Sequence, residues 1–224
     1  MPVAGQAQVL VCGVAEGFPP YQYVGIGGQA AGLDVEVATL VFHELGIPFQ
    51  FRQRPWVELY LGLAHRTGEV EVLCGAEVNA ERLTQLTFSR GYYQREVAIF
   101  VLGDSPYQSA KDLSGRPVTG DWGGVIETLV AQYRLRVLAA DTKELAFQRL
   151  KTGEVQAVMA PVEVGRWIAA QKGLAVRTLP ERDRGSPVAF AVAKGNLALA
   201  ARITDSLNRL EHQGKIEAIV KKYR

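Results

Sequence analysis

The sequence contains little of what several protein classes require. Only two cysteines, Cys12 and Cys74, occur among its 224 residues, too few for a disulfide-built scaffold and without the spacing of a metal site. The three histidines are widely separated, so we predict no zinc site. The longest apolar runs, Val97–Leu102 and Val188–Ala193, fall far short of the roughly 20 residues that cross a bilayer. We therefore expect no membrane span, no metal and no cofactor.

Charge of one sign and catalytic motifs are also scarce. Lys and Arg total 25 against 23 Asp and Glu, a net charge of +2, so we expect no nucleic-acid partner. A G-x-S-x-G motif and a phosphate loop are both absent, since the glycines of Gly25–Gly28 have no accompanying lysine. The N-terminus, Met1–Gly5, lacks a secretory pattern. This leaves either a cytoplasmic protein or a chain that starts at a mature boundary.

What the sequence does contain is a repeated alternation of strands and helices. Hydrophobic residues make up 48% of the chain, enough for a large core. Short, mostly apolar segments predict strands over 9–14, 69–74, 116–120, 135–138 and 154–160, and alternation of apolar and polar residues predicts one over 47–52. Helical periodicity predicts helices over 33–45, 56–64, 124–133, 142–151, 197–212 and 216–223. This order predicts an α/β fold whose sheets are mostly parallel and flanked by helices.

A short repeat indicates two related lobes. Thr67–Val70 recurs as Thr152–Val155, each time between a helix and an apolar strand. Ligands of open α/β sheets bind beyond the carboxyl ends of the strands. We therefore expect the ligand-binding segments to be 15–23, 75–82, 120–125 and 160–163.

The order of these motifs resembles one family over nearly the whole chain, from Val9 to Tyr223. The motifs that carry the resemblance are Phe18-Pro19-Pro20-Tyr21, Gly32-Leu33-Asp34-Val35-Glu36, Pro55-Trp56, Gly68-Glu69-Val70, the stretch from Gly75 to Glu81-Arg82, Phe88-Ser89, Tyr92-Tyr93, Ala193-Lys194-Gly195 and the final helices around Gly214. In this respect the chain is similar to the type II periplasmic solute-binding proteins, in the amino-acid-binding group (family 3) that serves ABC importers.

The resemblance implies a two-lobed fold joined by two crossover strands. Residues 1–96 and 188–224 would form lobe 1, and residues 97–187 would form lobe 2. By this analogy the protein captures a small polar or amino-acid-like ligand between the lobes by hinge closure, without catalysis. Its expected partners are that ligand and an ABC permease. The same analogy implies a periplasmic or other extracytoplasmic location and a monomeric state.

The resemblance also implies a set of binding residues. Arg82 would hold the ligand's carboxylate, since a guanidinium is planar, always charged and bidentate toward carboxylates. The alternative for Arg82 is a structural ion pair with Glu81 or another neighbour. The remaining expected site residues are the aromatic walls Phe18, Tyr21 and Trp56, the stretch Gly75, Ala76 and Glu77, and the helix-opening backbone amides of Gly123, Gly124 and Val125.

Three positions depart from the family's pattern. Glu77 stands where relatives place a hydroxyl, Pro161 where amino-acid binders often place an aspartate for the ligand's ammonium group, and Ala15 at an early acidic position. Glu163 could replace the aspartate, and Glu77 could instead pair with Arg82. These departures leave a cationic, aromatic or non-amino-acid ligand equally open.

Two other functions and one redox question remain open at this point. A carboxylate such as Glu77 or Glu163, desolvated in an aromatic cleft, could act as the general acid of a cyclohexadienyl or arogenate dehydratase. A sensory domain that passes closure to a membrane partner would have the same sequence features. Cys12 and Cys74 lie near the ends of neighbouring strands in such a fold, and we expect them to be two buried thiols rather than a disulfide.

Overall fold

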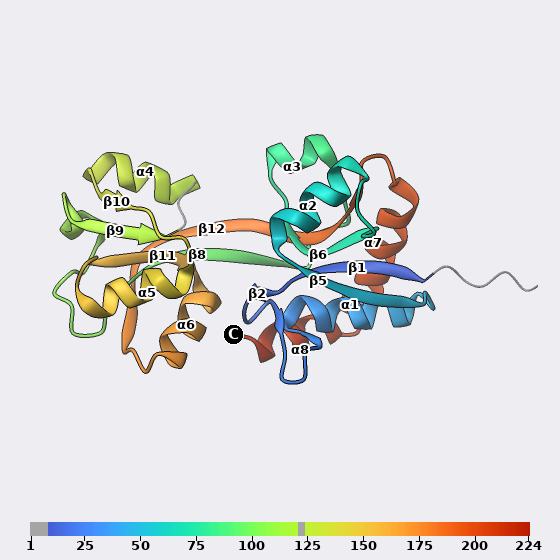
Figure 1. Cartoon of the computed structure of the whole chain (residues 1–224), viewed down its shortest axis with the longest axis horizontal. Coiled ribbons are helices and arrows are strands. Elements are labelled where there is room, and N and C mark those ends of the chain that lie inside the picture. Colours follow the sequence, from blue (N-terminus) through green and yellow to red (C-terminus); the bar gives the residue numbers. More distant parts are fainter. Residues whose placement is uncertain (1–8, 121–123) are drawn as a thin grey trace, which may run out of the picture. The chain divides into compact units, whose positions relative to one another are not determined.

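The computed structural model describes residues 9–120 and 124–224. The chain forms two compact units (Figure 1). Unit 1 contains the described residues up to Tyr93 together with Pro187–Arg224, and unit 2 is Gln94–Ser186. Unit 1 is therefore assembled from two separate stretches of sequence, whereas unit 2 is continuous.

The strands of unit 1 have a parallel centre. Strand β1 lies between two parallel neighbours, β5 and β6, and β6 is followed by the antiparallel strand β12, whose last residues also pair with β7. A small separate sheet, β2-β3-β4, follows β1 in the sequence. The bounds are β1 Leu10–Ala15, β2 Gly17–Phe18, β3 Gln22–Val24, β4 Ala30–Ala31, β5 Phe49–Arg54, β6 Val72–Glu77, β7 Leu86–Phe88 and β12 Val176–Ala193.

Helices cover both faces of these strands (Figure 1). They are α1 Leu33–Glu44, α2 Trp56–His65, α3 Ala80–Gln85, α7 Leu197–His212 and α8 Lys215–Lys222. Helix α2 lies on one face and packs Leu59 and Leu63 against Leu73 and Ala76 of β6. Helices α1 and α8 lie on the opposite face. This covering buries β1 and β6 on both sides, as their mostly apolar sequences require, whereas the edge strand β5 is polar in part and partly exposed.

Unit 2 is built on strands in the order β10-β9-β11-β8-β12. Strand β9 is parallel to β10 and β11, whereas β11 is antiparallel to β8. The bounds are β8 Tyr93–Leu102, β9 Pro117–Gly120, β10 Arg136–Leu138 and β11 Ala157–Pro161. The helices of this unit are the short 3-10 helix η1 Ala110–Leu113, α4 Gly124–Tyr133, α5 Lys143–Thr152 and α6 Val162–Gln171.

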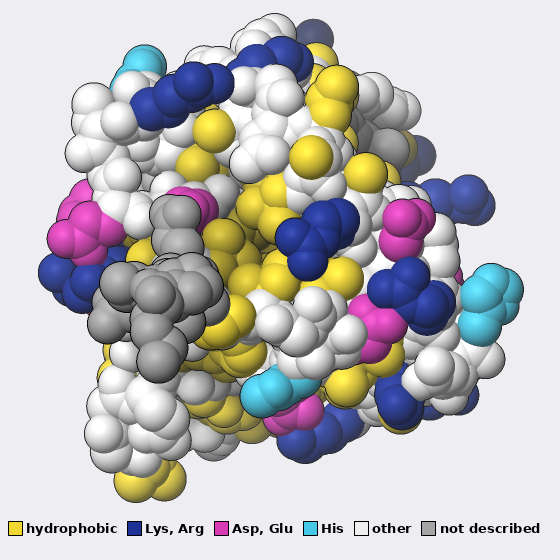
Figure 2. All heavy atoms as spheres, turned by 90° about the vertical axis from the view of Figure 1, so that its right-hand side faces the viewer, with side chains coloured by type: hydrophobic (Ala, Val, Ile, Leu, Met, Phe, Trp, Pro, Cys, Tyr) yellow, Lys and Arg dark blue, Asp and Glu magenta, His cyan; other side chains and the backbone are white. Residues whose placement is uncertain are grey.

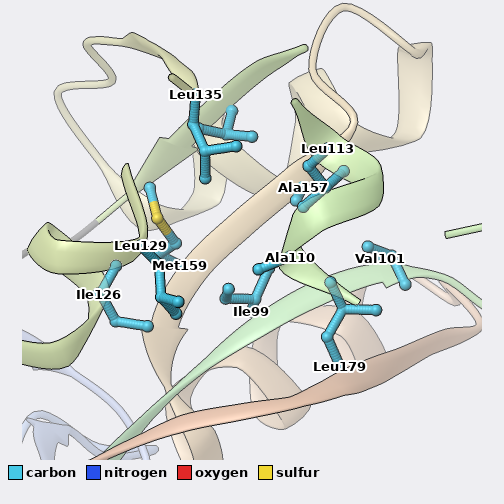
Figure 3. Packing of buried hydrophobic residues seen from close by; sticks show 11 residues of the cluster. Ile99, Val101, Ala110, Leu113, Ile126, Leu129, Leu135, Ala157, Met159 and Leu179 are labelled. Carbon is cyan, nitrogen blue, oxygen red and sulfur yellow. The ribbon is translucent and has the colours of Figure 1, made fainter. Parts of the chain in front are cut away.

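The core of unit 2 joins strands and helices of that unit (Figure 3). Ile99 and Met159 come from neighbouring strands, Leu113 from the 3-10 helix, Ile126 from α4 and Leu179 from β12. Each of these side chains is at most 1% exposed. Burial of a leucine or isoleucine side chain contributes about 1.5–3 kcal/mol, so this cluster gives the unit a core of its own.

The predicted α/β fold class is confirmed, with differences in particular elements. Predicted strand 69–74 is observed as Val72–Glu77, so Gly75, Ala76 and Glu77 end a strand instead of following one. Helices α3 and α6 were not predicted, whereas β8 and β12 span the positions at which the resemblance implied two crossover strands. Over Arg182–Gly185 the long strand β12 is polar and partly exposed, which hides its continuity from an apolar-run criterion.

One end face of the molecule carries charged side chains of both signs, in agreement with the small net charge. On the end face in Figure 2, Lys and Arg side chains are interspersed with Asp and Glu and do not gather into one basic surface. Across residues 9–120 and 124–224, none of the helices is both long enough and apolar enough to span a membrane.

Candidate functional site

The ligand segments predicted for lobe 1 meet at one edge of the parallel strands of unit 1. Strand β1 ends at Ala15 and β6 ends at Glu77. Because these two strands are parallel neighbours, their carboxyl ends lie at the same edge. The chain continues from there into the aromatic segment 17–23 and into helix α3.

The aromatic segment forms a row of rings. Phe18 ends β2, and its ring centroid is 5.7 Å from that of Tyr21. Tyr21 is 3% exposed and stacks on Tyr93 at 5.5 Å. Phe18, which is more exposed, can therefore offer a ring face to a ligand, while Tyr21 mainly supports it. Tyr93 was not predicted as part of this cluster.

The N-terminus of α1 fixes the aromatic segment from below. The backbone N–H of Leu33 donates to the carbonyl of Pro20 at 3.1 Å, and that of Asp34 donates to the carbonyl of Tyr21 at 3.0 Å. Gly32 precedes the helix with φ 118°, and a Cβ there would lie 2.3 Å from the Tyr21 carbonyl oxygen. The first two backbone N–H groups of α1, which have no partners within the helix, thus bind the carbonyl groups of Pro20 and Tyr21.

Arg82 lies in the first turn of α3 and is held by several neighbours. The side chain of Asn79 caps this helix by accepting from the Arg82 backbone N–H at 2.8 Å. The guanidinium donates from Nη1 to the Glu77 carbonyl oxygen at 3.0 Å. It also lies over the rings of Trp56, at 5.0 Å, and Tyr60, at 5.8 Å. Such contacts fix the orientation of a long side chain.

Trp56 has two neighbours in this arrangement. The sequence predicts that it forms a wall against the ligand, and in the structure its ring lies under the Arg82 guanidinium and stacks on Tyr60, with ring centroids 6.3 Å apart. Tyr60 had no predicted role. Its spacing of four residues from Trp56 on one helix could have indicated the ring pair.

Gly75, Ala76 and Glu77 have three different environments at the end of β6. Gly75 adopts φ 70°, and its α-carbon faces the buried Asp34 carboxylate. Ala76 is 0% exposed and its side chain packs in the core against α2, so only its backbone can reach a ligand. Glu77 is partly exposed and pairs with Val188 across the sheet.

A buried polar cluster lies directly beneath these segments. Gln22 and Asp34 are 1% and 0% exposed. The Gln22 amide donates to Asp34 Oδ2 at 2.9 Å, and the Tyr92 hydroxyl donates to Asp34 Oδ1 at 2.7 Å. Burial raises the pKa of the Tyr92 phenol well above its ordinary value, and the Asp34 charge adds to this effect. The sequence placed Gln22 in an expected ligand-binding segment and Asp34 and Tyr92 in motifs of the family, but it did not predict that the three side chains bond to one another.

The two cysteines lie beside this cluster as free, buried thiols, as predicted. Cys12 is on β1 and Cys74 is on the adjacent strand β6. Burial raises the pKa of the Cys74 thiol well above its ordinary value, and a hydrogen bond with Cys12 contributes to the shift. The Cys74 thiol therefore stays protonated at neutral pH and behaves as a small apolar group.

The predicted site residues of the second lobe fall in unit 2. Pro161 ends β11 and precedes α6, where the Glu163 carboxylate accepts from Arg166 Nη1 at 3.0 Å. The backbones of Gly124 and Val125 begin helix α4, and Gly123 lies outside the described residues. Glu163 is thus paired with a cation of its own helix.

The described parts of the chain, 9–120 and 124–224, contain no group of three or more His, Cys, Asp or Glu residues that could hold a metal ion. At the edge where β1 and β6 end, the predicted site residues offer the held Arg82 guanidinium, the partly exposed Glu77 and several aromatic rings. Such groups suit recognition of a small charged molecule.

Comparisons with known proteins agree with this chemistry. A model of the bacterial extracellular solute-binding proteins, family 3, matches residues 10–224. The chain is 22% identical to the ABC transporter arginine-binding protein 1 of Escherichia coli K12 over 222 residues, which cover 96% of this chain and 90% of the relative. It is 24% identical to the arginine-binding extracellular protein ArtP of Bacillus subtilis 168, covering 96% and 85%.

Solved structures show the same fold. An ancestral arginine-binding protein bound to glutamine superimposes with a TM-score of 0.79 at 27% identity, covering 96% of this chain and 97% of that one. A histidine kinase sensor domain similar to periplasmic binding proteins gives a TM-score of 0.81 at 26% identity, covering 96% of both chains. The amino-acid-binding relatives named above are binding proteins rather than enzymes, which favours binding over the dehydratase alternative.

Proposed function

Because this chain belongs to the bacterial extracellular solute-binding proteins of family 3, we propose that it binds an α-amino acid with a cationic side chain and delivers it to an ABC importer. The observation that carries the proposal is the fixed Arg82 guanidinium at the edge of the unit 1 strands. Family members act outside the cytoplasm, and we place this protein there too.

Arg82 is proposed to bind the ligand's α-carboxylate. Its stacking on Trp56 and its bond to the Glu77 carbonyl hold the guanidinium before the ligand arrives. A charged side chain that is already oriented loses less conformational entropy on binding. The partly exposed ring of Phe18 would then contact the apolar part of the ligand.

Glu77 is proposed to select a positively charged ligand. Its carboxylate stands five residues from Arg82, where a hydroxyl is usual in the family. A negative charge there favours a ligand that carries a cation besides its carboxylate. The named similarities to arginine-binding proteins support the same choice of ligand class.

We further propose that units 1 and 2 are the two lobes of the family's hinged fold and that they close on the ligand. The two passages of the chain between the units, at Tyr93/Gln94 and Ser186/Pro187, support this proposal. Small-angle scattering should show a smaller radius of gyration when L-arginine is added. An unchanged radius with saturated binding would contradict closure.

The proposal is tested by titration calorimetry with L-arginine and with neutral L-glutamine. Arg82→Ala should weaken arginine binding by about 2–5 kcal/mol, the range for removing one partner of a buried charge pair. Arg202→Ala, which removes an exposed arginine of α7, is the matched control and should bind as the wild type does. Equal affinities of the two variants would remove Arg82 from the site.

A second pair of variants tests the ligand class. Glu77→Gln should lower affinity for L-arginine more than for L-glutamine, while the exposed Glu217→Gln on α8 should change neither. If Glu77→Gln leaves the ratio of the two affinities unchanged, Glu77 does not select for a cation.

A sensory input domain is the second candidate function, because the chain is as similar to a histidine kinase sensor domain as it is to the arginine-binding structure. The neighbouring genes distinguish the two roles. Permease and ATPase genes would support import, whereas a kinase reading frame continuous with this chain would support sensing.

A further inference from the structure

We infer that Gln22, Asp34 and Tyr92 are positioning residues that hold the two ligand segments of unit 1, the aromatic segment 17–23 and the β6 end 74–77, in a fixed relation. The inference deepens the proposed function and rests on it for the identity of the ligand. Gln22, Asp34 and Tyr92 are 1%, 0% and 6% exposed. Because they are buried, they are placed to affect a ligand through the two segments that they hold, without touching it.

Gln22 connects four parts of unit 1 through one amide group. Its Oε1 accepts from the Ala15 backbone N–H at 2.6 Å, which ties β3 to the end of β1. Its Nε2 donates to the Cys74 carbonyl oxygen at 2.6 Å and to Asp34 Oδ2 at 2.9 Å, which adds the end of β6 and the start of α1. Because these bonds are buried, each unmade one would cost about 1–3 kcal/mol.

Asp34 is the centre of the network. It is the second residue of α1, where the helix dipole favours a negative charge. Its two carboxylate oxygens accept from different elements, Oδ2 from Gln22 and Oδ1 from the Tyr92 hydroxyl. Its own backbone N–H holds the Tyr21 carbonyl. One residue thus bonds to two successive residues of the aromatic segment.

Gly75 shows how closely the β6 end fits this network. A Cβ at Gly75 would lie 1.9 Å from Asp34 Oδ2 and 2.5 Å from Gln22 Nε2. No side chain can occupy that space while the network is intact. The backbone at Gly75, which leads on to Glu77 and Arg82, therefore packs directly against the Gln22 and Asp34 side chains.

Tyr92 extends the network to the last residues of unit 1 before the chain enters unit 2. Its hydroxyl bonds to Asp34, while its ring lies 5.1 Å from that of Tyr93, which stacks on Tyr21. The aromatic segment is consequently held twice at this end, by a hydrogen bond through Asp34 and by ring contact through Tyr93.

The test compares two variants that remove the same chemical group. Tyr92→Phe deletes a hydroxyl that donates to Asp34 at 2.7 Å, and Tyr223→Phe deletes one that donates to Glu36 at 2.6 Å, also on α1 but outside the ligand segments. In the ligand-free protein, hydrogen exchange of residues 15–22 and 74–77 should accelerate about tenfold in Tyr92→Phe. It should stay at the wild-type rate in Tyr223→Phe. Gln22→Ala, which frees the Ala15 amide, should reproduce the effect.

Affinity for L-arginine provides the second readout. We expect Tyr92→Phe and Gln22→Ala to weaken binding about tenfold and Tyr223→Phe to leave it unchanged. Acceleration spread evenly over unit 1 in proportion to lost stability, or equal behaviour of the two tyrosine variants, would overturn the inference. A wild-type protein that binds no L-arginine would instead contradict the proposed ligand, and the exchange measurement would still decide the role of the network.

Discussion

Replacing Gly75 with alanine should destabilise unit 1 far more than the same change at another left-handed glycine. Gly75 has φ 70°, and a methyl group placed on its α-carbon would lie 1.9 Å from Asp34 Oδ2. Gly46 has φ 63° and open space around it. Gly46→Ala therefore measures the backbone cost alone, about 1–2 kcal/mol for an L-residue in this region.

Gly75→Ala adds a second cost, because the new methyl group must displace the Gln22 amide or the Asp34 carboxylate. Each buried polar group left without its partner costs about 1–3 kcal/mol. The sum is a loss of about 2–5 kcal/mol of unfolding free energy for Gly75→Ala, or about 1–3 kcal/mol more than for Gly46→Ala.

Urea unfolding followed by hydrogen exchange of α1 amides reports on unit 1 specifically, since α1 belongs to that unit. Gly75→Ala should also weaken L-arginine binding, whereas Gly46→Ala should not. Equal losses of stability in the two variants would refute the reasoning, because they would show that the clash relaxes without disturbing the network.

Three further predictions concern pH, thiols and packing. Hydrogen bonding to Arg209 lowers the pKa of Glu44 to about 2, so the stability that this pair contributes is present above about pH 4.5 and is lost as the pH falls toward 2. Glu44→Gln should therefore make the urea midpoint depend less on pH over that interval, by a small amount because the pair is exposed to solvent. Ellman's reagent should detect neither Cys12 nor Cys74 in the native protein at pH 8 and both in guanidinium, and prompt native reaction would contradict their burial. Gly165→Ala should lower the free energy of unfolding by about 1–3 kcal/mol, because a Cβ at this position would lie 2.3 Å from the Phe100 ring of β8. Alanine favours helices more than glycine does, so a higher melting temperature in thermal unfolding would contradict the predicted clash.

The fold class could be predicted because the central parallel strands β1, β6 and β11 are mostly apolar and the helices are periodic. The polar middle of β12 could not be assigned in this way, since the exposed and charged segment Arg182–Arg184 resembles a loop in composition. The two copies of the predicted repeat, Thr67–Val70 and Thr152–Val155, also differ in backbone conformation although their sequences are identical. After α2 the left-handed position belongs to Arg66 at φ 56°, whereas after α5 it belongs to Gly153 at φ 77°.

For the site, motif resemblance located Arg82 and the aromatic segment but not what holds them. The roles of Gln22 and Tyr92 depend on contacts across 12 and 58 residues of sequence, to Asp34, which no local pattern encodes. One local indication was present. Asp34 sits between Leu33 and Val35 on the buried start of α1, and a carboxylate at such a position requires buried donors.

The split composition of unit 1 has a consequence during synthesis. Strands β6 and β7 emerge from the ribosome well before their antiparallel partner, the last part of β12, and α1 emerges long before α7 and α8, which contact it. Unit 2, being continuous, has all of its residues available first. Unit 1 can therefore complete its fold only after the final stretch Pro187–Arg224 has been synthesised. A chain truncated before that stretch would contain all residues of unit 2 but only part of unit 1.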